Sequence, residues 1–418
     1  MRETRGTVAT VIGNMLEWYD FTVYALFAAY IAGNFFPATD APGTQLLKTF
    51  LVFGLGFVAR PLGALLIGSY GDKAGRKAAL TLTIWLMAAG TALIAFAPTY
   101  ASVGIAAPLV LLTGRLLQGF SAGGEVGGAA AYLLESAAAD RRGRVASWLQ
   151  ASMGLANILG TLVAFSVTAS LSATQVREWG WRIPFVLGLL IAPAGLVLRS
   201  ALNETEAFKS ARHQFKPAPL LQVFGHHKRT LLNGFSVAVL WAVAVYVLMI
   251  FLPTYVQHAP FNFPAREAFG AALIGNVPFV LGCVLFGAWS DRIGRRMSLS
   301  ISTAALLIGV LPLMVWLRAV PTFAILLIVQ STLCIMVSAF VGVAPSALSE
   351  IFPPSVRSTG TSLVYNGAFT VFGGFAPTIL TWISQRSNGS VFAPAWYVMC
   401  AACVTLLAIP FLEESPTH

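Results

Sequence analysis

Five ionisable side chains lie within long apolar stretches of this sequence, where a charge is costly to hold. They are Glu17, Asp20, Arg60, Arg115 and Glu125. A charged group in such surroundings is a functional candidate by default, and it needs a partner nearby. A buried carboxylate can take up and release a proton, while a guanidinium binds a carboxylate through two parallel hydrogen bonds. The chemistry that these residues could perform is therefore proton exchange and the binding of an anion.

Helix geometry predicts the depth of each charge. At about 1.5 Å per residue, Asp20, Arg60 and Glu125 lie roughly 15 to 22 Å from the charged ends of their helices, and Arg115 lies roughly 30 Å from its own. Three of the charges thus cluster about half-way along their helices, with Arg115 further outward. The matching depth of Arg60 and Glu125 predicts a pair, which could be structural or could open onto a cavity.

The first helix carries a polar stripe. At about 100° per residue, Asn14, Glu17, Asp20 and Tyr24 fall within one arc of this helix. Such a stripe needs a water-filled cavity or a partner helix. For Glu17, a structural ion pair that holds helices together is an equally good interpretation.

The elements that carry these residues are membrane helices. Hydrophobic residues make up 57% of the 418 residues and charged residues 10%, against about 25% charged residues in a soluble domain. The alternation typical of a membrane barrel is missing from the sequence, so helices must satisfy the backbone in lipid. A span needs about 20 apolar residues. The predicted spans are 8–36, 45–70, 78–97, 104–134, 145–170, 183–200, 230–257, 269–290, 298–317, 322–348, 359–384 and 395–412.

The distribution of basic residues predicts how these helices are oriented. With the N-terminus inside the cell, 18 of the 26 Lys and Arg residues fall in cytoplasmic segments, 6 fall on the opposite side and 2 lie within spans. Membrane proteins carry an excess of basic residues in their cytoplasmic segments. Both termini are therefore expected to be cytoplasmic, and the net charge of +10 needs no nucleic-acid partner to explain it.

One charged decapeptide occurs twice in the chain. GSYGDKAGRK at 68–77 and GAWSDRIGRR at 287–296 share the pattern Gly-x-x-x-Asp-x-x-Gly-Arg-basic, and each follows the second span of a set of six. The long polar segment 201–229 separates the two sets. We expect an all-α membrane protein of twelve transmembrane helices, in which six-helix bundles at 1–200 and 230–418 are related by pseudo-two-fold symmetry and joined by a cytoplasmic linker.

Several of these motifs resemble those of a known superfamily. Both decapeptides resemble the signature loop of the major facilitator superfamily, and GRLLQGFSAGG (114–124) resembles its fourth-helix Arg-x-x-Gln-Gly motif. GNMLEWYDF (13–21), EWGWRIPF (178–185) and ETEAF (204–208) resemble the metabolite:proton symporters. Within that family the chain is most similar to the citrate and tricarballylate symporters, and porters for shikimate, proline/betaine and α-ketoglutarate are the alternatives.

The resemblance implies a proton-coupled secondary symporter that imports a small organic acid, such as citrate, by alternating access. In sugar:proton porters of the superfamily, a first-helix Asp faces the Arg of the fourth-helix motif and carries the proton, and Asp20 and Arg115 match those places. A substrate carboxylate that draws Arg115 away would make Asp20 a better proton acceptor, which would link the two binding events. Glu17 and Glu125 are the other proton-coupling candidates.

Polar residues within the spans are candidates for substrate binding, although each could equally serve as hydrogen-bonded packing between helices. The substrate-binding candidates are Arg115, Arg60, Asn14, Tyr24, Gln118, Tyr246, Asn276 and Asn366. By the resemblance, charges at helix ends are expected to hold the cytoplasmic side closed. These gating candidates are Asp72, Arg76, Glu135, Arg144, Asp291, Arg295, Glu350 and Arg357. In the fourth span, the spacing of Gly119 and Gly123 predicts close contact with a neighbouring helix.

Other functional classes fit the sequence less well. An uncoupled facilitator would not need a buried titratable group such as Asp20. An enzyme is not expected, because the sequence contains neither an HExxH motif nor a nucleotide-binding loop, and no cofactor or metal is expected. The expected partners are a small organic anion, protons and the lipid bilayer, with no nucleic acid and with the protein acting as a monomer.

Overall fold

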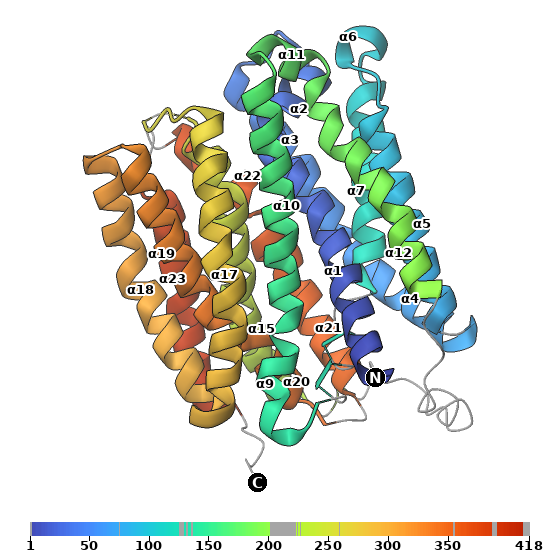
Figure 1. Cartoon of the computed structure of the whole chain (residues 1–418), viewed down its shortest axis with the longest axis vertical. Coiled ribbons are helices and arrows are strands. Elements are labelled where there is room, and N and C mark those ends of the chain that lie inside the picture. Colours follow the sequence, from blue (N-terminus) through green and yellow to red (C-terminus); the bar gives the residue numbers. More distant parts are fainter. Residues whose placement is uncertain are drawn as a thin grey trace.

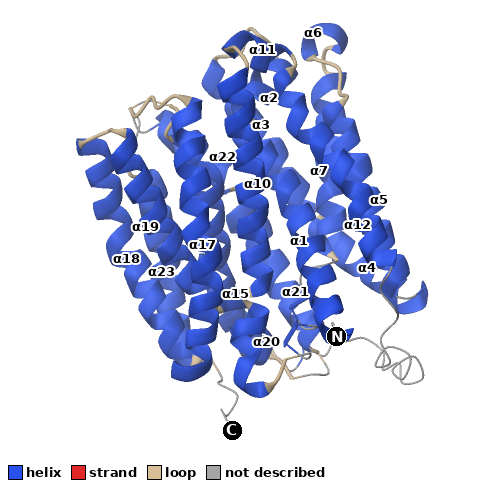
Figure 2. Cartoon of the chain, in the orientation of Figure 1, coloured by secondary structure: helices blue, strands red, loops and turns tan. Residues whose placement is uncertain are grey.

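The structure is a computed structural model, and every regular element in its described residues is a helix (Figure 2). It describes residues 2–74, 76–124, 129–130, 133–134, 137–200, 223, 225, 227–258, 260–353, 356–386 and 391–412. Most of the predicted linker 201–229 lies outside these residues. The division into bundles at 1–200 and 230–418 therefore stays a prediction.

The first half of the chain forms the first six helical columns of the described structure. They are α1 (Arg2–Leu26) with α2 (Ala28–Phe35), α3 (Pro42–Val58) with α4 (Arg60–Ala74), α5 (Arg76–Ala95), α7 (Ala106–Gly123), α9 (Arg142–Ala146) with α10 (Trp148–Ser170), and α12 (Ile183–Ser200). Short helical turns lie between them: α6 (Tyr100–Val103), η1 (Ala139–Arg141), α11 (Ala173–Glu178) and η2 (Gly180–Arg182).

The second half forms the other six columns. They are α15 (Lys228–Val243) with η3 (Ala244–Phe251) and α16 (Leu252–Tyr255), α17 (Ala265–Ile293), α18 (Arg295–Ala319), α19 (Phe323–Val341) with α20 (Ala344–Glu350), α21 (Arg357–Ala368) with η4 (Phe369–Gly374) and α22 (Ala376–Arg386), and α23 (Ala393–Ala408) with η5 (Ile409–Phe411). Both η3 and η4 are π-helical. Neither of these wider turns is predicted from the sequence.

The twelve columns coincide with the twelve predicted spans, and they confirm an all-α membrane fold. Within the described residues, eight helices are long and apolar enough to cross a membrane, and shorter apolar helices cover 81–95 and 180–190. The ends differ from the predicted ones by a few residues, except in the fourth span, where α7 ends at Gly123 and part of the predicted stretch up to residue 134 lies outside the described residues. The second column, for example, runs over 42–74 instead of 45–70, because helices continue beyond the apolar stretch into the repeated loop.

The columns run side by side, and both ends of the chain lie at one end of the molecule, here called the termini end (Figure 1). Helices α9 and α20 also lie there, whereas α6 and α11 lie at the opposite end. The two halves of the chain meet along α10 and α17, and also where α1 contacts η3, α3 contacts η4 and α22, and α4 contacts α21. The centre of the molecule is therefore a seam between the halves.

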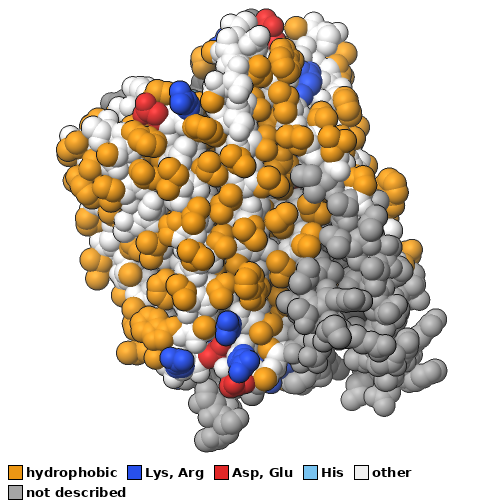
Figure 3. Space-filling model, viewed as in Figure 1, with side chains coloured by type: hydrophobic (Ala, Val, Ile, Leu, Met, Phe, Trp, Pro, Cys, Tyr) orange, Lys and Arg blue, Asp and Glu red, His pale blue; other side chains and the backbone are white. Residues whose placement is uncertain are grey.

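The outer surface of the columns suits a lipid environment. Figure 3 shows hydrophobic side chains spread over the middle of one face, with Lys, Arg, Asp and Glu gathered toward its two ends. On α17, Leu281 is 60% exposed and Leu285 is 68% exposed. Large apolar side chains at such exposure are expected where lipid, and not water, surrounds the protein.

Glycines bring α7 very close to α3 and α4. A Cβ atom added at Gly119 would overlap the carbonyl oxygen of Gly56, and one added at Gly123 would overlap the carbonyl oxygen of Arg60. A Cβ at Gly56 would in turn lie 2.9 Å from the carbonyl oxygen of Arg115. The predicted use of Gly119 and Gly123 for close helix contact is confirmed, and this contact brings the two arginine-bearing helices together.

Candidate functional site

Arg60 of α4 and Arg115 of α7 converge on one aromatic ring at the centre of the molecule. Their guanidinium carbons lie 4.9 Å and 4.7 Å, respectively, from the ring centroid of Phe21. Arg60 also lies 4.3 Å from the ring centroid of Phe57, and Arg115 lies 4.6 Å from that of Tyr24. Both arginine side chains are completely buried. Aromatic faces stabilise a desolvated cation electrostatically, so these rings help to hold the two charges in place.

The predicted offset in depth applies to the backbones of these arginines but not to their guanidinium groups. The Arg60 backbone is level with Gly123, which lies about 12 Å along α7 from Arg115 at the usual helical rise. The two long side chains close this gap, since both reach the ring of Phe21. The placing of Arg115 outside the central cluster was therefore wrong for its charge.

Most of the N–H groups on these two guanidiniums have no hydrogen-bond partner of good geometry among the described residues, although the hydroxyl groups of Tyr246 and Tyr365 lie near Arg60. This holds for Nε, Nη1 and Nη2 of Arg60 and for Nε and Nη2 of Arg115. In Arg115, Nη1 donates to Oε1 of Gln118 at 2.8 Å. A buried polar group without a partner costs about 1–3 kcal/mol, and more when it is charged. The pair is thus suited to receive an anion with several oxygen atoms.

Arg60 has Glu17 as its acidic neighbour. Nη2 of Arg60 lies 3.8 Å from Oε1 of Glu17, and both side chains are buried. The predicted partner of Arg60 was Glu125, which lies outside the described residues. The pair of Arg60 with Glu125 therefore stays a prediction, and among the described residues Glu17 is the acidic neighbour of Arg60. A separation of 3.8 Å leaves room for a substrate carboxylate to replace this contact.

Asp20 lies within the first half of the chain, against α5, α7 and α12. Its Oδ2 accepts a short hydrogen bond from Thr91 and another of 3.3 Å from Nε2 of Gln118. A Cβ added at Gly188 would lie 2.9 Å from its Oδ1. Asp20 does not form a direct ion pair with Arg115 in the described structure. Instead Gln118 connects the two, because its amide donates to Asp20 and its oxygen accepts from Arg115.

Two other first-helix candidates are engaged in packing. The amide of Asn14 donates to the carbonyl oxygen of Leu149 at 3.0 Å and to Oγ of Ser152 at 2.8 Å, which joins α1 to α10. The hydroxyl of Tyr24 donates to the carbonyl oxygen of Thr49 at 3.1 Å. Tyr24 still contributes its ring to the central cluster through Arg115, whereas the structure gives Asn14 a role between helices.

The second half adds tyrosines to the central cluster. The hydroxyl of Tyr246, on the π-helical segment η3, interacts electrostatically with both Arg60 and Arg115, and that of Tyr365 interacts with Arg60. The ring of Tyr246 lies 5.3 Å from that of Phe57, so it packs on the same aromatic cluster. π-Helical turns often occur at functional sites, where the extra residue changes the direction of a side chain. Of these residues, Tyr246 is one of the predicted substrate-binding candidates.

The two asparagines predicted in the second half of the chain, Asn276 and Asn366, have different contacts. Nδ2 of Asn366 donates to the carbonyl oxygen of Gly123 at 3.1 Å, which links the halves beside the α4–α7 contact. Nδ2 of Asn276 donates to the carbonyl oxygen of Ala272 within its own helix. In each residue Oδ1 is buried and accepts no hydrogen bond from the described residues. Asn366 therefore contacts a helix that carries one of the arginines, whereas the hydrogen bond that Asn276 donates stays within its own helix.

Sequence reasoning missed Thr91 and the phenylalanine rings around the arginines. The hydroxyl of Thr91 donates a hydrogen bond to Asp20, and it accepts one of 2.9 Å from Nε2 of Gln118. A single threonine in an apolar helix gave no signal, since threonine hydroxyls commonly bond their own helix, as Thr91 also does with Met87. The rings gave none because the chain has 29 Phe residues.

At the termini end, Asp291 of α17 joins the two halves. Its carboxylate accepts hydrogen bonds from the backbone N–H groups of Gly143 (2.7 Å) and Arg144 (3.0 Å) and from the guanidinium of Arg295 (2.8 Å). Arg295 also donates twice to Glu350, at 3.2 Å each time. A carboxylate at the start of α9 satisfies backbone donors that have no partner within the helix. Arg144 contributes to this contact through its backbone.

The remaining gating candidates are only partly described. Nε of Arg357 donates to the carbonyl oxygen of Ser349 at 2.9 Å, which ties α21 to α20. The side chains of Asp72 and Arg76 and the whole of Glu135 lie outside the described residues. Their roles stay predictions.

The opposite end is closed as well. Thr254 of α16 donates to the carbonyl oxygen of Ala25 at 2.9 Å, and Gln385 of α22 donates to that of Gly43 at 2.7 Å. The halves thus touch at both ends, with the arginine cluster completely buried between them.

Comparison with known proteins agrees with this geometry. The profile of the family described as "Sugar (and other) transporter" matches residues 6–218 and 269–418. The chain is 38% identical over 400 residues to the citrate-proton symporter of Salmonella typhi, covering 96% of this chain and 92% of the relative. It is 36% identical to the citrate-proton symporter of Klebsiella pneumoniae, covering 96% of this chain and 89% of the relative.

A further relative and a solved structure complete the comparison. The glycine betaine/proline/ectoine/pipecolic acid transporter OusA of Dickeya dadantii is 31% identical, covering 99% of this chain and 84% of that protein. The E. coli xylose transporter XylE, in its partially occluded inward open conformation, shows a TM-score of 0.79 at 17% identity, covering 99% of this chain and 98% of that one. This similarity confirms the predicted twelve-helix fold with two related bundles.

Proposed function

The chain belongs to the Sugar (and other) transporter family of the major facilitator superfamily, and on this premise we propose that it is a proton-coupled symporter of a small organic acid. The substrate class proposed is a di- or tricarboxylate such as citrate, imported by alternating access. Two relatives named as citrate-proton symporters share 36–38% identity with nearly the whole chain, which supports this substrate class.

The observation that carries the proposal is the pair of buried arginines, most of whose N–H groups lack a hydrogen-bond partner of good geometry in the part of the chain that the structure describes. Each guanidinium can bind one carboxylate through two parallel hydrogen bonds. Arg60 and Arg115 share the ring of Phe21, so two carboxylates of one small molecule could reach both. With Glu17 and Asp20 both protonated, these arginines would leave two positive charges for a substrate with two ionised carboxylates.

The coupling mechanism follows from competition for the arginines. A carboxylate beside a cation stays ionised, and it binds a proton more readily when that cation is taken away. A substrate carboxylate that binds Arg60 would release Glu17, and one that binds Arg115 would reorganise Gln118 and weaken its contact with Asp20. Substrate binding and proton binding would then favour each other, as symport requires.

We also propose the orientation and the moving parts. The termini end is the cytoplasmic side of the inner membrane, since basic residues are concentrated there. The bundles 1–200 and 230–418 rock about the central site, and the protein acts as a monomer. The contacts of Asp291 with Gly143 and Arg144 would break when the cytoplasmic side opens.

A proline or betaine carrier is the competing function, because OusA is 31% identical to this chain. A zwitterionic substrate carries one carboxylate and a cationic nitrogen, and aromatic rings could hold the nitrogen. Here the rings of Phe21, Phe57 and Tyr24 already face guanidinium groups. Two cations at the centre would repel a third, which favours the organic acid.

A thermal-unfolding screen of the purified protein tests the proposal. Citrate, tricarballylate, α-ketoglutarate, succinate, shikimate, proline and betaine are compared at equal concentration. A ligand that binds the folded protein increases its free energy of unfolding by mass action, by about 2.7 kcal/mol when the ligand concentration is 100 times its Kd. The melting temperature rises as a result. We expect a shift with a di- or tricarboxylate that disappears in Arg60→Ala and Arg115→Ala. A shift with betaine or proline and none with any acid would contradict the proposed substrate class.

A further inference from the structure

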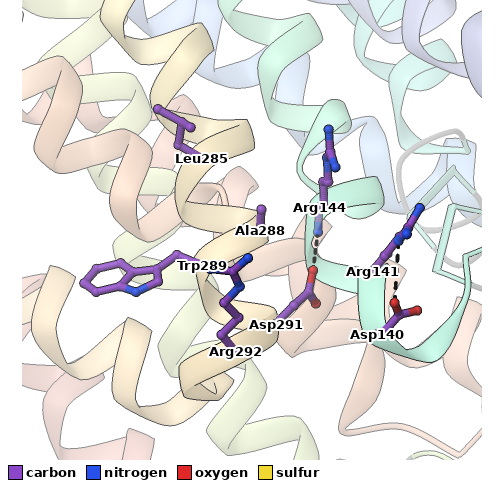
Figure 4. Close-up of a pocket in the computed structure, with 8 residues that line it drawn as sticks. All are labelled: Asp140, Arg141, Arg144, Leu285, Ala288, Trp289, Asp291 and Arg292. Atoms are coloured by element: carbon purple, nitrogen blue, oxygen red, sulfur yellow. Dashed lines mark hydrogen bonds and ion pairs between the residues drawn. The ribbon is translucent and has the colours of Figure 1, made fainter.

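A basic groove lies at the termini end, between the two halves of the chain (Figure 4). Its volume is about 530 Å³. Arg141 and Arg144 line it from η1 and α9, and Leu285, Trp289 and Arg292 line it from α17. Its position is separate from the central arginine cluster, so the proposed function leaves it unexplained.

The charges in this groove do not balance. Asp291 is fully engaged, since it accepts hydrogen bonds from the backbone of Gly143 and Arg144 and from Arg295. Asp140 pairs with Arg141 at 3.5 Å. Within the described part of the chain, the guanidinium groups of Arg144 and Arg292 have no acidic partner within 4 Å. The three arginines that line the groove outnumber its two aspartates by one, and neither Arg144 nor Arg292 forms an ion pair with another described residue.

The α17 wall of the groove follows the layers of a membrane. Leu285, Trp289 and Arg292 are spaced four and three residues apart, so they share one face of the helix. Leu285 is 68% exposed and Trp289 is 46% exposed. From the middle of a bilayer outward, the hydrocarbon core is followed by the interface and then by the headgroups. Leucine suits the first of these layers, tryptophan the second and arginine the third. A ligand in this groove would meet apolar surface on one side and positive charge on the other.

We propose that this groove binds the headgroup of an anionic phospholipid from the leaflet at the termini end. Arg144 and Arg292 bind the phosphate oxygens, and an acyl chain lies along Leu285 and Trp289. Guanidinium groups bind phosphate through paired, charge-assisted hydrogen bonds. Basic pockets between membrane helices are suited to lipid headgroups. A soluble anion would gain from the arginines but not from the apolar wall.

The lipid would also favour one conformation of the protein. Arg144 belongs to the first half and Arg292 to the second, and the contact of Asp291 with the start of α9 holds the two walls together. When this contact breaks, the two cations separate and can no longer share one phosphate. A ligand shifts an equilibrium toward the state that it binds better. Anionic lipid would therefore stabilise the conformation that is closed at the termini end.

The test measures lipid binding to the purified full-length protein in detergent, without substrate. Native mass spectrometry counts bound phosphatidylglycerol and phosphatidylcholine in the wild type and in the double variant Arg144→Ala/Arg292→Ala. Alanine at 144 keeps the backbone N–H that bonds Asp291, so the walls stay paired. Arg229→Ala removes a charge at the same end, outside the groove, and is the matched control.

We expect the wild type and Arg229→Ala to retain phosphatidylglycerol in preference to phosphatidylcholine. The double variant should bind phosphatidylglycerol at least about tenfold more weakly, with an unchanged melting temperature in the absence of lipid. Equal retention of phosphatidylglycerol by the folded double variant would overturn the proposal. So would displacement of the lipid by millimolar inorganic phosphate, because that result would assign the groove to a soluble anion.

Discussion

Asp20 and Arg115 are connected through the amide of Gln118 and do not touch each other in the described structure. Nη1 of Arg115 donates to Oε1 of Gln118 at 2.8 Å, and Nε2 of Gln118 donates to Oδ2 of Asp20 at 3.3 Å. The amide thus transmits the position of Arg115 to the carboxylate. A change at the arginine alters the hydrogen bonding of Asp20 without any movement of α1.

Gln118→Leu should therefore uncouple substrate binding from proton binding. Leucine has similar length but can neither donate to Asp20 nor accept from Arg115, so both lose a partner. We expect proton-driven uptake to fall by at least about tenfold, since a lost buried hydrogen bond to a charged group costs about 1.5–3 kcal/mol. Counterflow should fall less. Gln330→Leu, at a buried glutamine on α19 that bonds Leu248, is the control. An equal loss in both variants would argue against a special role for Gln118.

Glu17→Gln should release Arg60 from its acidic neighbour. Glutamine keeps the size of the side chain but removes the charge that lies 3.8 Å from Nη2 of Arg60. Citrate binding should be retained or tightened, because the substrate no longer competes with Glu17. The number of protons carried with each substrate should fall by about one. Proton and substrate fluxes measured together in proteoliposomes check this, and an unchanged ratio would assign Glu17 a structural role.

Gly123→Ala should destabilise the protein by about 1–3 kcal/mol, because the added Cβ overlaps the carbonyl oxygen of Arg60. Separation of α4 from α7 should also displace the Arg60 guanidinium, so ligand-induced stabilisation should decrease. Gly33→Ala is a matched control, since no atom lies within 4 Å of a Cβ at that position. Thermal unfolding with and without citrate distinguishes the two variants. Similar stability of both would contradict the close packing.

Asp291→Ala should impair closure at the termini end while substrate binding is retained. The variant loses the acceptor for Gly143, Arg144 and Arg295. Uptake should fall several-fold, and solvent access to the central site from the termini end should rise. Asp140→Ala, which removes an exposed carboxylate paired with Arg141, should change little. If citrate binding were lost in a folded Asp291→Ala protein, Asp291 would belong to the substrate site.

The sequence predicted the architecture well because its signals are strong in a membrane protein. Twelve apolar stretches and a repeated charged loop were enough to place the helices, and the predicted closeness of Gly119 and Gly123 to a neighbour was right. The contact of Arg60 with Glu17 could not be assigned from spacing, since residue spacing gives depth along a helix but not which helices are neighbours, and the pair of Arg60 with Glu125 stays a prediction. For the same reason, the meeting of Arg60 and Arg115 over Phe21 had no sequence signal.

The sequence identified the charged residues of the candidate site but not the hydrogen bonds that connect them. Asp20, Arg115 and Gln118 were all candidates, yet the sequence implied a direct contact between the first two. The π-helical turn that carries Tyr246 was also missed, because a π-turn has no distinct composition. Thr91 became a site residue only through the way in which helices from distant parts of the chain pack.

Asp20→Asn in proteoliposomes with an imposed pH gradient tests proton coupling most directly. Asparagine resembles a protonated aspartate and cannot exchange a proton. In the wild type, uptake of labelled citrate should rise as the pH of the side from which citrate enters is lowered. The variant should lose all accumulation against a gradient yet keep citrate binding and counterflow, because Arg60 and Arg115 are intact. If Asp20→Asn still concentrates citrate in response to the pH gradient, the proton is carried by another residue and this assignment is wrong.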